Sequence, residues 1–387
     1  MQHRKIRQVK TTDLYFIATL VTLFFAMSAI IITNGSFFRL FFFSDQDDSL
    51  MDFFNSIIEV HTKKPYSEFG VLYPPLANCF FYVLQLFIPN TIKEAWPKNH
   101  KETLYLVGTS NDIRMSQPCM VVFLLTFLLF IFLFIVIIRK YTKSCSDTLI
   151  FSLLFSHAMI QILEHGNVVL IAFVFAMIFY IYHDNDNPVL RELSLISLAI
   201  SFGFKLYPAI LGMVLLKKRQ YKDAVKAIIY GILFTILPLL FLDGISGLPI
   251  WFNNVFAFGT ESFSKTENLV RIASILFCVI IILWNTLPSK SNSYFKLTES
   301  QYIMIICWLM ILISGNVDGS TLIFVIMPFL IFCNEEKYIN RYNIPELIIY
   351  LSCLLPLGIN KLEYFFLPIF FVCGINRNKH NLQQNQQ

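Results

Sequence analysis

Long apolar runs separated by short polar segments dominate the chain. The runs lie near residues 14–33, 71–89, 118–138, 148–163, 168–182, 193–216, 227–242, 268–284, 301–314, 320–333, 345–357 and 363–374. Most exceed the ten or so residues of a membrane-spanning β-strand, and the helix is the other structure that satisfies every backbone polar group in hydrocarbon. The pattern therefore predicts an all-α polytopic membrane protein with roughly 11 to 13 transmembrane or re-entrant helices.

Basic residues gather in alternate connectors and set the predicted orientation. The basic connectors are the N-terminal arm, 139–143, 217–226, 290–296, 337–341 and the segment after 376. By the positive-inside rule these face the cytoplasm. The intervening connectors 44–71, 164–167, 243–268 and 314–320 then face outward. Residues 1–375 are expected to form a single transmembrane domain whose first helix is the run 14–33, and the polar tail 376–387 is expected to be disordered in the cytoplasm.

The run 193–216 does not fit a simple crossing, because basic residues flank both of its ends. Arg191 precedes the run, and the segment 217–219 that follows it is entirely basic. A break at 203–208 resolves the conflict, since each half of about 11 residues rises only about 17 Å against a hydrocarbon core of about 30 Å. We therefore expect a re-entrant hairpin over 193–216 with Lys205 at its tip.

Composition supports a bilayer environment. Apolar residues make up 56% of the 387 residues and charged residues 14%, with a mean hydropathy of +0.63, whereas a soluble domain carries about 25% charged residues. The net charge of +5 comes from connectors that would face anionic lipid headgroups, so it does not indicate a nucleic-acid partner. The eight Cys residues lack CxxC-type spacing and lie mostly in apolar runs, which favours small hydrophobic side chains over a metal site.

The outer loop 44–71 begins with crowded carboxylates. Asp45, Asp47, Asp48 and Asp52 fall within eight residues. Like charges at this spacing repel one another and raise at least one pKa, which suits a general base; a metal ion, a basic residue or a substrate group would also serve as partner. If 50–58 forms a helix at the membrane surface, Asp48 and Asp52 share one helix face. The alternative interpretation is a solvated acidic segment.

Other polar residues occur where hydrocarbon would make them costly. The turn 164–167 places Glu164, His165 and Asn167 at membrane depth, where polar groups need partners or a function. Lys205 interrupts an apolar stretch and should meet an anion, for which a phosphate oxygen is well suited. The alternatives are a hydrated hairpin turn and a lysine that snorkels to a headgroup.

Prolines fix the chain near the start of the second apolar run. Tyr66 follows Pro65, and Tyr73 precedes a double proline, which either marks a helix start or shapes a wall that brings Tyr73 toward a site. Arg271, at the outer end of another apolar run, would add to these polar residues at the outer side of the membrane. The chain has no Walker A loop, dinucleotide glycine fingerprint, HExxH or GxSxG motif, which argues against ATP-driven transport and favours a lipid over a nucleotide as carrier of any activated sugar.

In their order along the chain these motifs resemble glycosyltransferase family 87, a polyprenyl-phosphate-sugar-dependent, mannosyltransferase-like group of the C-type glycosyltransferase superfamily. The shared features are an outer-loop Asp, Pro-Tyr, Tyr-Pro-Pro-Leu, a Gly-polar turn and Lys-x-x-Pro before a basic loop. In this sequence they are Asp48, 65–66, 73–76, 166–167 and 205–208. The resemblance covers mainly the first 220 residues. Asn167 stands where the family usually has Gln, and 90–118 is a long insertion.

The resemblance implies the C-type architecture and an inverting hexosyltransferase without a metal or other cofactor. It would transfer a mannose-like sugar from a polyprenyl-phosphate donor to a lipid-linked or cell-envelope glycan acceptor at the outer face of the plasma membrane. Asp48 would be the general base, with Asp52 as its rival and Asp47 third. Lys205 would contact the donor phosphate. The other residues expected to bind substrate are Tyr66, Tyr73, Glu164, His165, Asn167 and Arg271.

Two other classes of membrane protein fit part of the pattern. A lipid-linked-oligosaccharide flippase or other transporter should show two related halves and charges along a path through the membrane, whereas the ionisable groups here collect on one face. A polysaccharide polymerase would favour a large late outer loop with paired arginines, and Arg is scarce outside the basic connectors. Abundant Ile, Phe, Asn and Lys indicate an AT-rich coding bias, which fits a bacterial cytoplasmic membrane.

Overall fold

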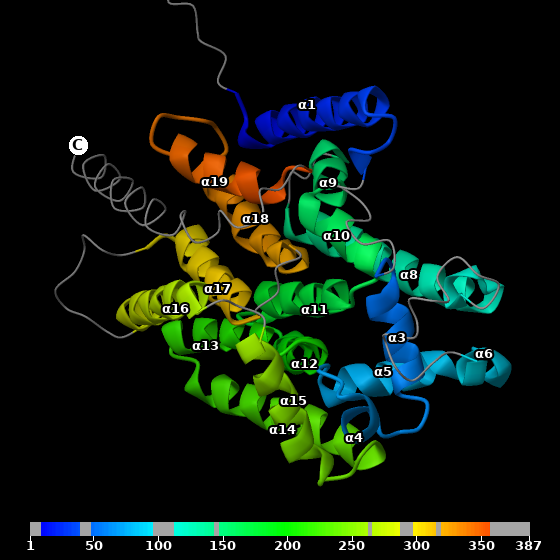
Figure 1. The fold of residues 1–387 in the computed structure, drawn as a ribbon. Coiled ribbons are helices and arrows are strands. Elements are labelled where there is room, and N and C mark those ends of the chain that lie inside the picture. The colour runs from blue at the N-terminus through cyan, green and yellow to red at the C-terminus, as the bar shows by residue number, and fades with distance from the viewer. Residues whose placement is uncertain are drawn as a thin grey trace, which may run out of the picture. The chain divides into compact units, whose positions relative to one another are not determined.

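The computed structural model describes residues 9–38, 48–95, 112–142, 147–261, 265–286, 297–314 and 319–356 (Figure 1). Within these ranges the regular structure is helical, apart from one isolated bridge between Lys10 and Tyr338. The all-helical prediction is therefore confirmed. The chain divides into two compact units. Unit 1 comprises Met1–Phe41, Ile138–Ile160 and Leu269–Gln387, and unit 2 comprises Phe42–Ile137 and Gln161–Asn268.

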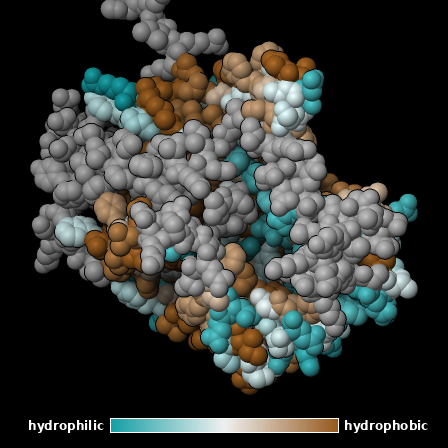
Figure 2. Space-filling model, viewed as in Figure 1, coloured by the Kyte–Doolittle hydropathy of each residue, from teal (hydrophilic) through white to brown (hydrophobic). Residues whose placement is uncertain are grey.

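Four helices in the described ranges are long and apolar enough to cross a membrane. They are α1 (Thr11–Ile32), α8 (Gln117–Tyr141), α14 (Tyr221–Phe241) and residues Asn268–Thr286 of α16 (Lys265–Thr286). Large apolar side chains are exposed on each of them, and Figure 2 shows such apolar surface in brown. Helices α9 (Asp147–Leu154) and α10 (His157–His165), bent by 50°, would add a fifth span. The chain is thus a membrane protein, and the count of 11 to 13 spans stays a prediction.

Unit 1 has a nearly all-apolar core. Almost every residue of α17 (Glu299–Ser314) is buried, and Tyr15 of α1 is fully buried against the Phe329 ring, with centroids 4.9 Å apart. The buried carboxylate of Glu346 accepts a hydrogen bond from Gln301 Nε2, which satisfies a polar group that would otherwise be costly there. The helices of unit 1 are α1, α9, the start of α10, most of α16, α17 (Glu299–Ser314), η4 (Ser320–Val325), α18 (Ile326–Glu335) and α19 (Ile344–Leu354).

Unit 2 is centred on a helical hairpin formed by α11 (Val169–Tyr182) and α12 (Pro188–Phe204). Asn187 caps α12 by accepting a hydrogen bond from Val189 N at 2.9 Å, and Ser201 Oγ of α12 donates to Ala172 O of α11 at 2.7 Å. The helices of unit 2 are α3 (Met51–Glu59), α4 (Pro65–Phe69), α5 (Pro75–Gln85), α6 (Asn90–Ala95), η2 (Ile113–Met115), most of α8, the end of α10, α11 (Val169–Tyr182), α12 (Pro188–Phe204), η3 (Tyr207–Gly212), α13 (Met213–Lys217), α14 and α15 (Gly247–Glu261).

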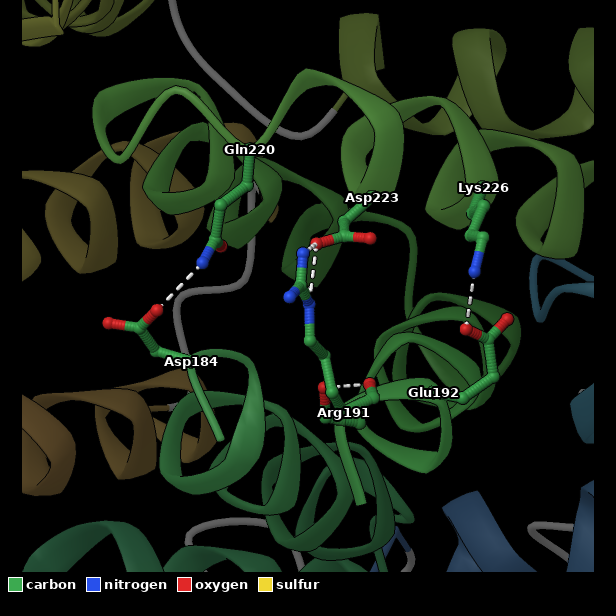
Figure 3. Close-up of polar contacts among 7 residues, drawn as sticks. Asp184, Arg191, Glu192, Gln220, Asp223 and Lys226 are labelled. Atoms are coloured by element: carbon green, nitrogen blue, oxygen red, sulfur yellow. Dashed lines mark hydrogen bonds and ion pairs between the residues drawn. The ribbon is translucent and has the colours of Figure 1, made fainter. Parts of the chain in front are cut away.

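A charged seam joins the N-terminal ends of α12 and α14 (Figure 3). Arg191 Nε donates to Asp223 Oδ2 at 2.8 Å, and Asp223 is buried. Asp184 accepts from Lys218 Nζ at 2.7 Å, and this hydrogen bond holds the pKa of Asp184 below its usual range. The seam therefore fixes how α12 lies against α14. Its members are Asp184, Arg191, Glu192, Lys218, Gln220, Asp223 and Lys226.

Helix α12 ends at Phe204, inside the predicted break at 203–208. Lys205 is extended, with φ −145° and ψ 137°, and the chain continues through η3 and α13. Gly203 allows α12 to approach α5, because a Cβ there would lie 2.6 Å from Leu76 Cδ2. The helix break lies where the sequence placed the hairpin tip, and the re-entrant path through the membrane stays a prediction.

Two connectors predicted to lie outside the membrane contain helices. The outer connector 243–268 contains the whole of α15. The helix considered over 50–58 is present as α3, which starts at Met51 after the left-handed Leu50, with φ +63°. Asp48 therefore precedes the helix and does not share a helix face with Asp52.

Candidate active site

The turn 164–167 binds the start of α3. Leu50 N donates to Glu164 O at 2.7 Å, and Ser49 Oγ donates to the same oxygen at 3.3 Å, across 115 residues of sequence. Gly166 closes the turn in the left-handed region, with φ +69°. These contacts place the carboxylates that flank Leu50 beside the polar side chains of the turn.

Asp48 and Asp52 each face a different side chain of this turn. Asp48 Oδ2 lies 3.6 Å from His165 Nδ1, and the Asp48 side chain is 56% exposed. Asp52 Oδ2 accepts from Asn167 Nδ2 at 2.6 Å. Asn167 Oδ1 in turn accepts from Val169 N at 3.0 Å, which fixes the orientation of the amide. Asp48 is thus open to a substrate, whereas one oxygen of Asp52 is held in place.

His165 lies between two carboxylates. Its Nδ1 faces Asp48, and its Nε2 lies 3.2 Å from Glu164 Oε2. The Glu164 side chain is 1% exposed and the His165 side chain 11%. Both carboxylates are within ion-pair distance of the ring, and the Asp48 contact is longer than a hydrogen bond. The row Asp48, His165 and Glu164 is chemically equipped to accept and retain a proton.

Gly166 has no room for a side chain. A Cβ there would lie 3.0 Å from Phe53 Cβ and 3.3 Å from Leu50 O, in a backbone conformation that already disfavours other residues. Gly166→Ala is expected to destabilise the protein by about 1–3 kcal/mol, measured by thermal unfolding in detergent. Gly70→Ala is the matched control, because Gly70 has the same φ of +69° and nothing within 4 Å of its Cβ position. Equal effects of the two substitutions would contradict the packing argument.

Lys205 lies over the ring of Tyr73. Its Nζ is 4.3 Å from the ring centroid, which is a cation–π distance. The buried Phe81 ring contacts Tyr73 at 5.8 Å and also contacts Phe53, the neighbour of Asp52, at 5.8 Å. A single side chain therefore links the Lys205–Tyr73 pair to the segment that carries the carboxylates.

Tyr66 supports Tyr73. Tyr66 is 1% exposed, its hydroxyl donates to Tyr73 O at 3.1 Å, and it accepts from Asn78 Nδ2 at 3.0 Å. Burial raises the pKa of Tyr66 well above its usual value, so the phenol stays protonated and keeps its donor. Asn78 was not singled out in the sequence, where one Asn at the start of an apolar run gives no distinctive signal.

Arg114 also contacts the segment before α3. Its Nη1 donates to Ser49 O at 3.1 Å, and its Nη2 forms an ion pair with Asp112 at 2.8 Å. The pair lies in the long connector 90–118, and no motif marked it in the sequence. Arg114, paired with Asp112, therefore ties this connector to the backbone next to Asp48.

Two further residues, Asp47 and Arg271, were predicted for the site. Asp47 lies outside the described residues. Arg271 belongs to unit 1, where its guanidinium donates to Leu312 O at 2.6 Å and Ile313 O at 3.2 Å. In the part of the chain that the structure describes, no three His, Cys, Asp or Glu side chains are grouped so as to hold a metal ion.

Comparison with protein families gives the context of this geometry. The model of glycosyltransferase family 87 matches residues 104–331, more than half of the chain. The chain belongs to glycosyltransferase family 87. The resemblance read from the motifs is thereby confirmed, and the protein is a membrane glycosyltransferase that acts on a sugar donor and an acceptor. No curated protein and no solved structure matches the chain.

The family 87 match includes only part of the site. It covers the turn 164–167, Lys205 and Arg114, and it begins after the segment that carries Asp48 and Asp52. It also extends beyond residue 220, where the likeness was expected to fade. In this family 87 chain the carboxylates are therefore connected to the matched region by the contacts of the 164–167 turn.

Proposed function

We propose that the chain is an inverting hexosyltransferase that uses a polyprenyl-phosphate sugar donor and a lipid-linked or cell-envelope glycan acceptor, with mannose as the first sugar to test. The observation that carries the proposal is the pairing of Asp48 and Asp52 with His165 and Asn167 on one turn. Deprotonation of a hydroxyl requires an accessible base, and Asp48 is the more exposed of the two carboxylates.

Asp48 acts as the general base in this proposal. It takes the proton of the acceptor hydroxyl while that oxygen attacks the anomeric carbon, and the bond from this carbon to the phosphate oxygen breaks. Polyprenyl phosphate leaves with the bonding electron pair, and a single displacement inverts the anomeric configuration. Protonated His165, with the buried Glu164 on its other side, would stabilise the Asp48 carboxylate electrostatically across the 3.6 Å that separates them. Asp52, held by Asn167, stays beside the reacting groups as a fixed negative charge.

Lys205 binds the donor phosphate in this proposal. A compact ammonium suits a phosphate oxygen and neutralises the charge that grows on the leaving group. The ring of Tyr73 keeps the ammonium in place from one side. The link through Phe81 supports one site that contains both the base and the phosphate contact.

The length of α12 supports a site toward the outer face of the plasma membrane. Its 17 residues rise about 26 Å at about 1.5 Å per residue, more than the half-hairpin predicted from the sequence. The basic connector 217–226, assigned to the cytoplasm, begins in the seam at the opposite end of α12 from Lys205. Lys205 would therefore lie close to the outer surface.

The proposal is tested by transfer of labelled sugar from synthetic polyprenyl-phosphate hexoses, with purified protein in lipid nanodiscs and an extracted glycolipid mixture as acceptor. Wild type is expected to form a labelled product with inverted anomeric configuration. Lys205→Ala is expected to lower transfer at least about tenfold at limiting donor, because the phosphate loses a charged hydrogen bond. Failure of wild type to use any of these donors would contradict the proposed function.

A further inference from the structure

The short helix α4 is capped by a residue from a distant part of the chain. The residue before it, Lys64, makes no side-chain cap, and Pro65 has no N–H to donate. Tyr66 N and Ser67 N donate to the two carboxylate oxygens of Asp243 at 3.1 and 3.2 Å, and Ser67 Oγ donates at 2.6 Å. Asp243 therefore satisfies the open N–H groups of α4 and places a negative charge at its positive end.

The segment that follows Asp243 holds the rest of the same loop. On α15, Asn254 Nδ2 donates to Tyr66 O at 3.2 Å. Trp251 Nε1 donates to Leu72 O at 3.1 Å, and the Trp251 side chain is 1% exposed. The loop from Tyr66 to Leu72 is thus held near both of its ends by residues that come just after α14.

The contacts continue from this loop to Lys205. Tyr66 OH donates to Tyr73 O at 3.1 Å, and Asn78 Nδ2 donates to the same oxygen at 3.2 Å. The backbone of Tyr73 is thereby fixed, and its ring lies 4.3 Å from Lys205 Nζ. A displacement of α4 would therefore move Tyr73, and the ring of Tyr73 would leave the ammonium.

We infer that Asp243 is a positioning residue, which holds Lys205 through Tyr66 and Tyr73 in the orientation that meets the donor phosphate. The assignment of the donor phosphate as the ligand of Lys205 rests on the proposed function, whereas the series of contacts from Asp243 to Lys205 does not. Asp243→Asn is the informative change, because an amide retains one acceptor oxygen and replaces the other with a donor that faces an N–H group. One of the two backbone hydrogen bonds of the cap is thereby lost, and the negative charge with it, with little change in volume.

The first test is a double-mutant cycle on sugar transfer. Asp243→Asn is expected to raise the donor KM about tenfold with little change in the acceptor KM. In a Lys205→Ala background the same change should alter the donor KM less than about twofold, because the group it positions is gone. Ser246→Ala is the control, since this exposed hydroxyl donates to the backbone oxygen of Asp243 and leaves the carboxylate untouched. Independent, additive effects of the two changes would overturn the inference.

The second test needs no turnover. An amine-reactive reagent is applied to the nanodisc protein, and modification of Lys205 is followed by peptide mass spectrometry, with the exposed Lys222 as internal reference. Asp243→Asn should raise the rate of Lys205 modification at least about threefold, whereas Ser246→Ala should leave that rate unchanged. An unchanged rate overturns the inference even if wild type transfers sugar. Faster modification without any wild-type transfer would contradict the proposed function and still support the role of Asp243 in holding Lys205.

Discussion

Asp48→Asn protein is expected to transfer sugar at least about 10²-fold more slowly than wild type, whereas Asp52→Asn should lose less than about tenfold. An amide at position 48 has no basic oxygen to receive the acceptor proton. At position 52 an amide oxygen still accepts the hydrogen bond from Asn167 Nδ2, so the geometry of the turn is retained. The measurement is the initial rate of labelled-sugar transfer at saturating donor and acceptor.

Glu68→Gln is the control for this comparison, because Glu68 is an exposed carboxylate on α4. It should transfer sugar at close to the wild-type rate. Thermal unfolding of each variant shows whether a slow variant is still folded, so that loss of the base is distinguished from loss of folded protein. A larger loss in Asp52→Asn than in Asp48→Asn would exchange the two roles, and wild-type rates in both variants would place the base elsewhere.

Gly203→Val is expected to lower the free energy of unfolding by about 1–3 kcal/mol and to reduce sugar transfer as well. A Cβ on Gly203 would lie 2.6 Å from Leu76 Cδ2 and 2.9 Å from Leu76 Cβ, so α12 must move away from α5. Lys205 follows two residues later and would move with the end of the helix. Thermal unfolding in nanodiscs and the transfer assay measure the two effects.

Gly231→Val is the matched control for Gly203→Val. A Cβ on Gly231, also within a helix, would meet Phe202 Cδ1 at 3.6 Å, which is ordinary contact. The Leu76→Ala change should partly rescue Gly203→Val by making room at the contact. If Leu76→Ala gives no rescue, the close approach of α12 to α5 does not explain the loss.

The fold was predictable where one apolar run forms one helix. The runs 14–33 and 118–138 became α1 and α8 with boundaries within a few residues. The run 148–163 was expected as one element and is bent by 50° between α9 and α10, where Ser156 Oγ accepts from Met159 N at 3.4 Å. Apolar periodicity does not reveal such a local cap, because Ser also occurs inside membrane helices.

The candidate site was predictable where polar residues interrupt apolar sequence. Lys205 and the turn 164–167 stood out for this reason, and the structure shows both of them in specific contacts. Asp243 did not stand out, because a single Asp in a polar connector is ordinary and its partners lie 176 and 177 residues away. Side-chain contacts between distant segments depend on the tertiary fold, which the local pattern does not contain.

Helices α12 and α14 both start at the charged seam, and α12 leads to Lys205 while α14 leads to Asp243. The number of residues from Arg191 to Lys205 therefore sets the position and rotation of Lys205 relative to the seam. One residue inserted into it would turn everything beyond by about 100° and advance it by about 1.5 Å, which takes the ammonium off the Tyr73 ring. An insertion in the connector 90–118 does not change this spacing, because the connector lies outside α12. The distance along α12 from the seam to the ammonium thus determines the contact between Lys205 and Tyr73 as much as the identity of the lysine itself does.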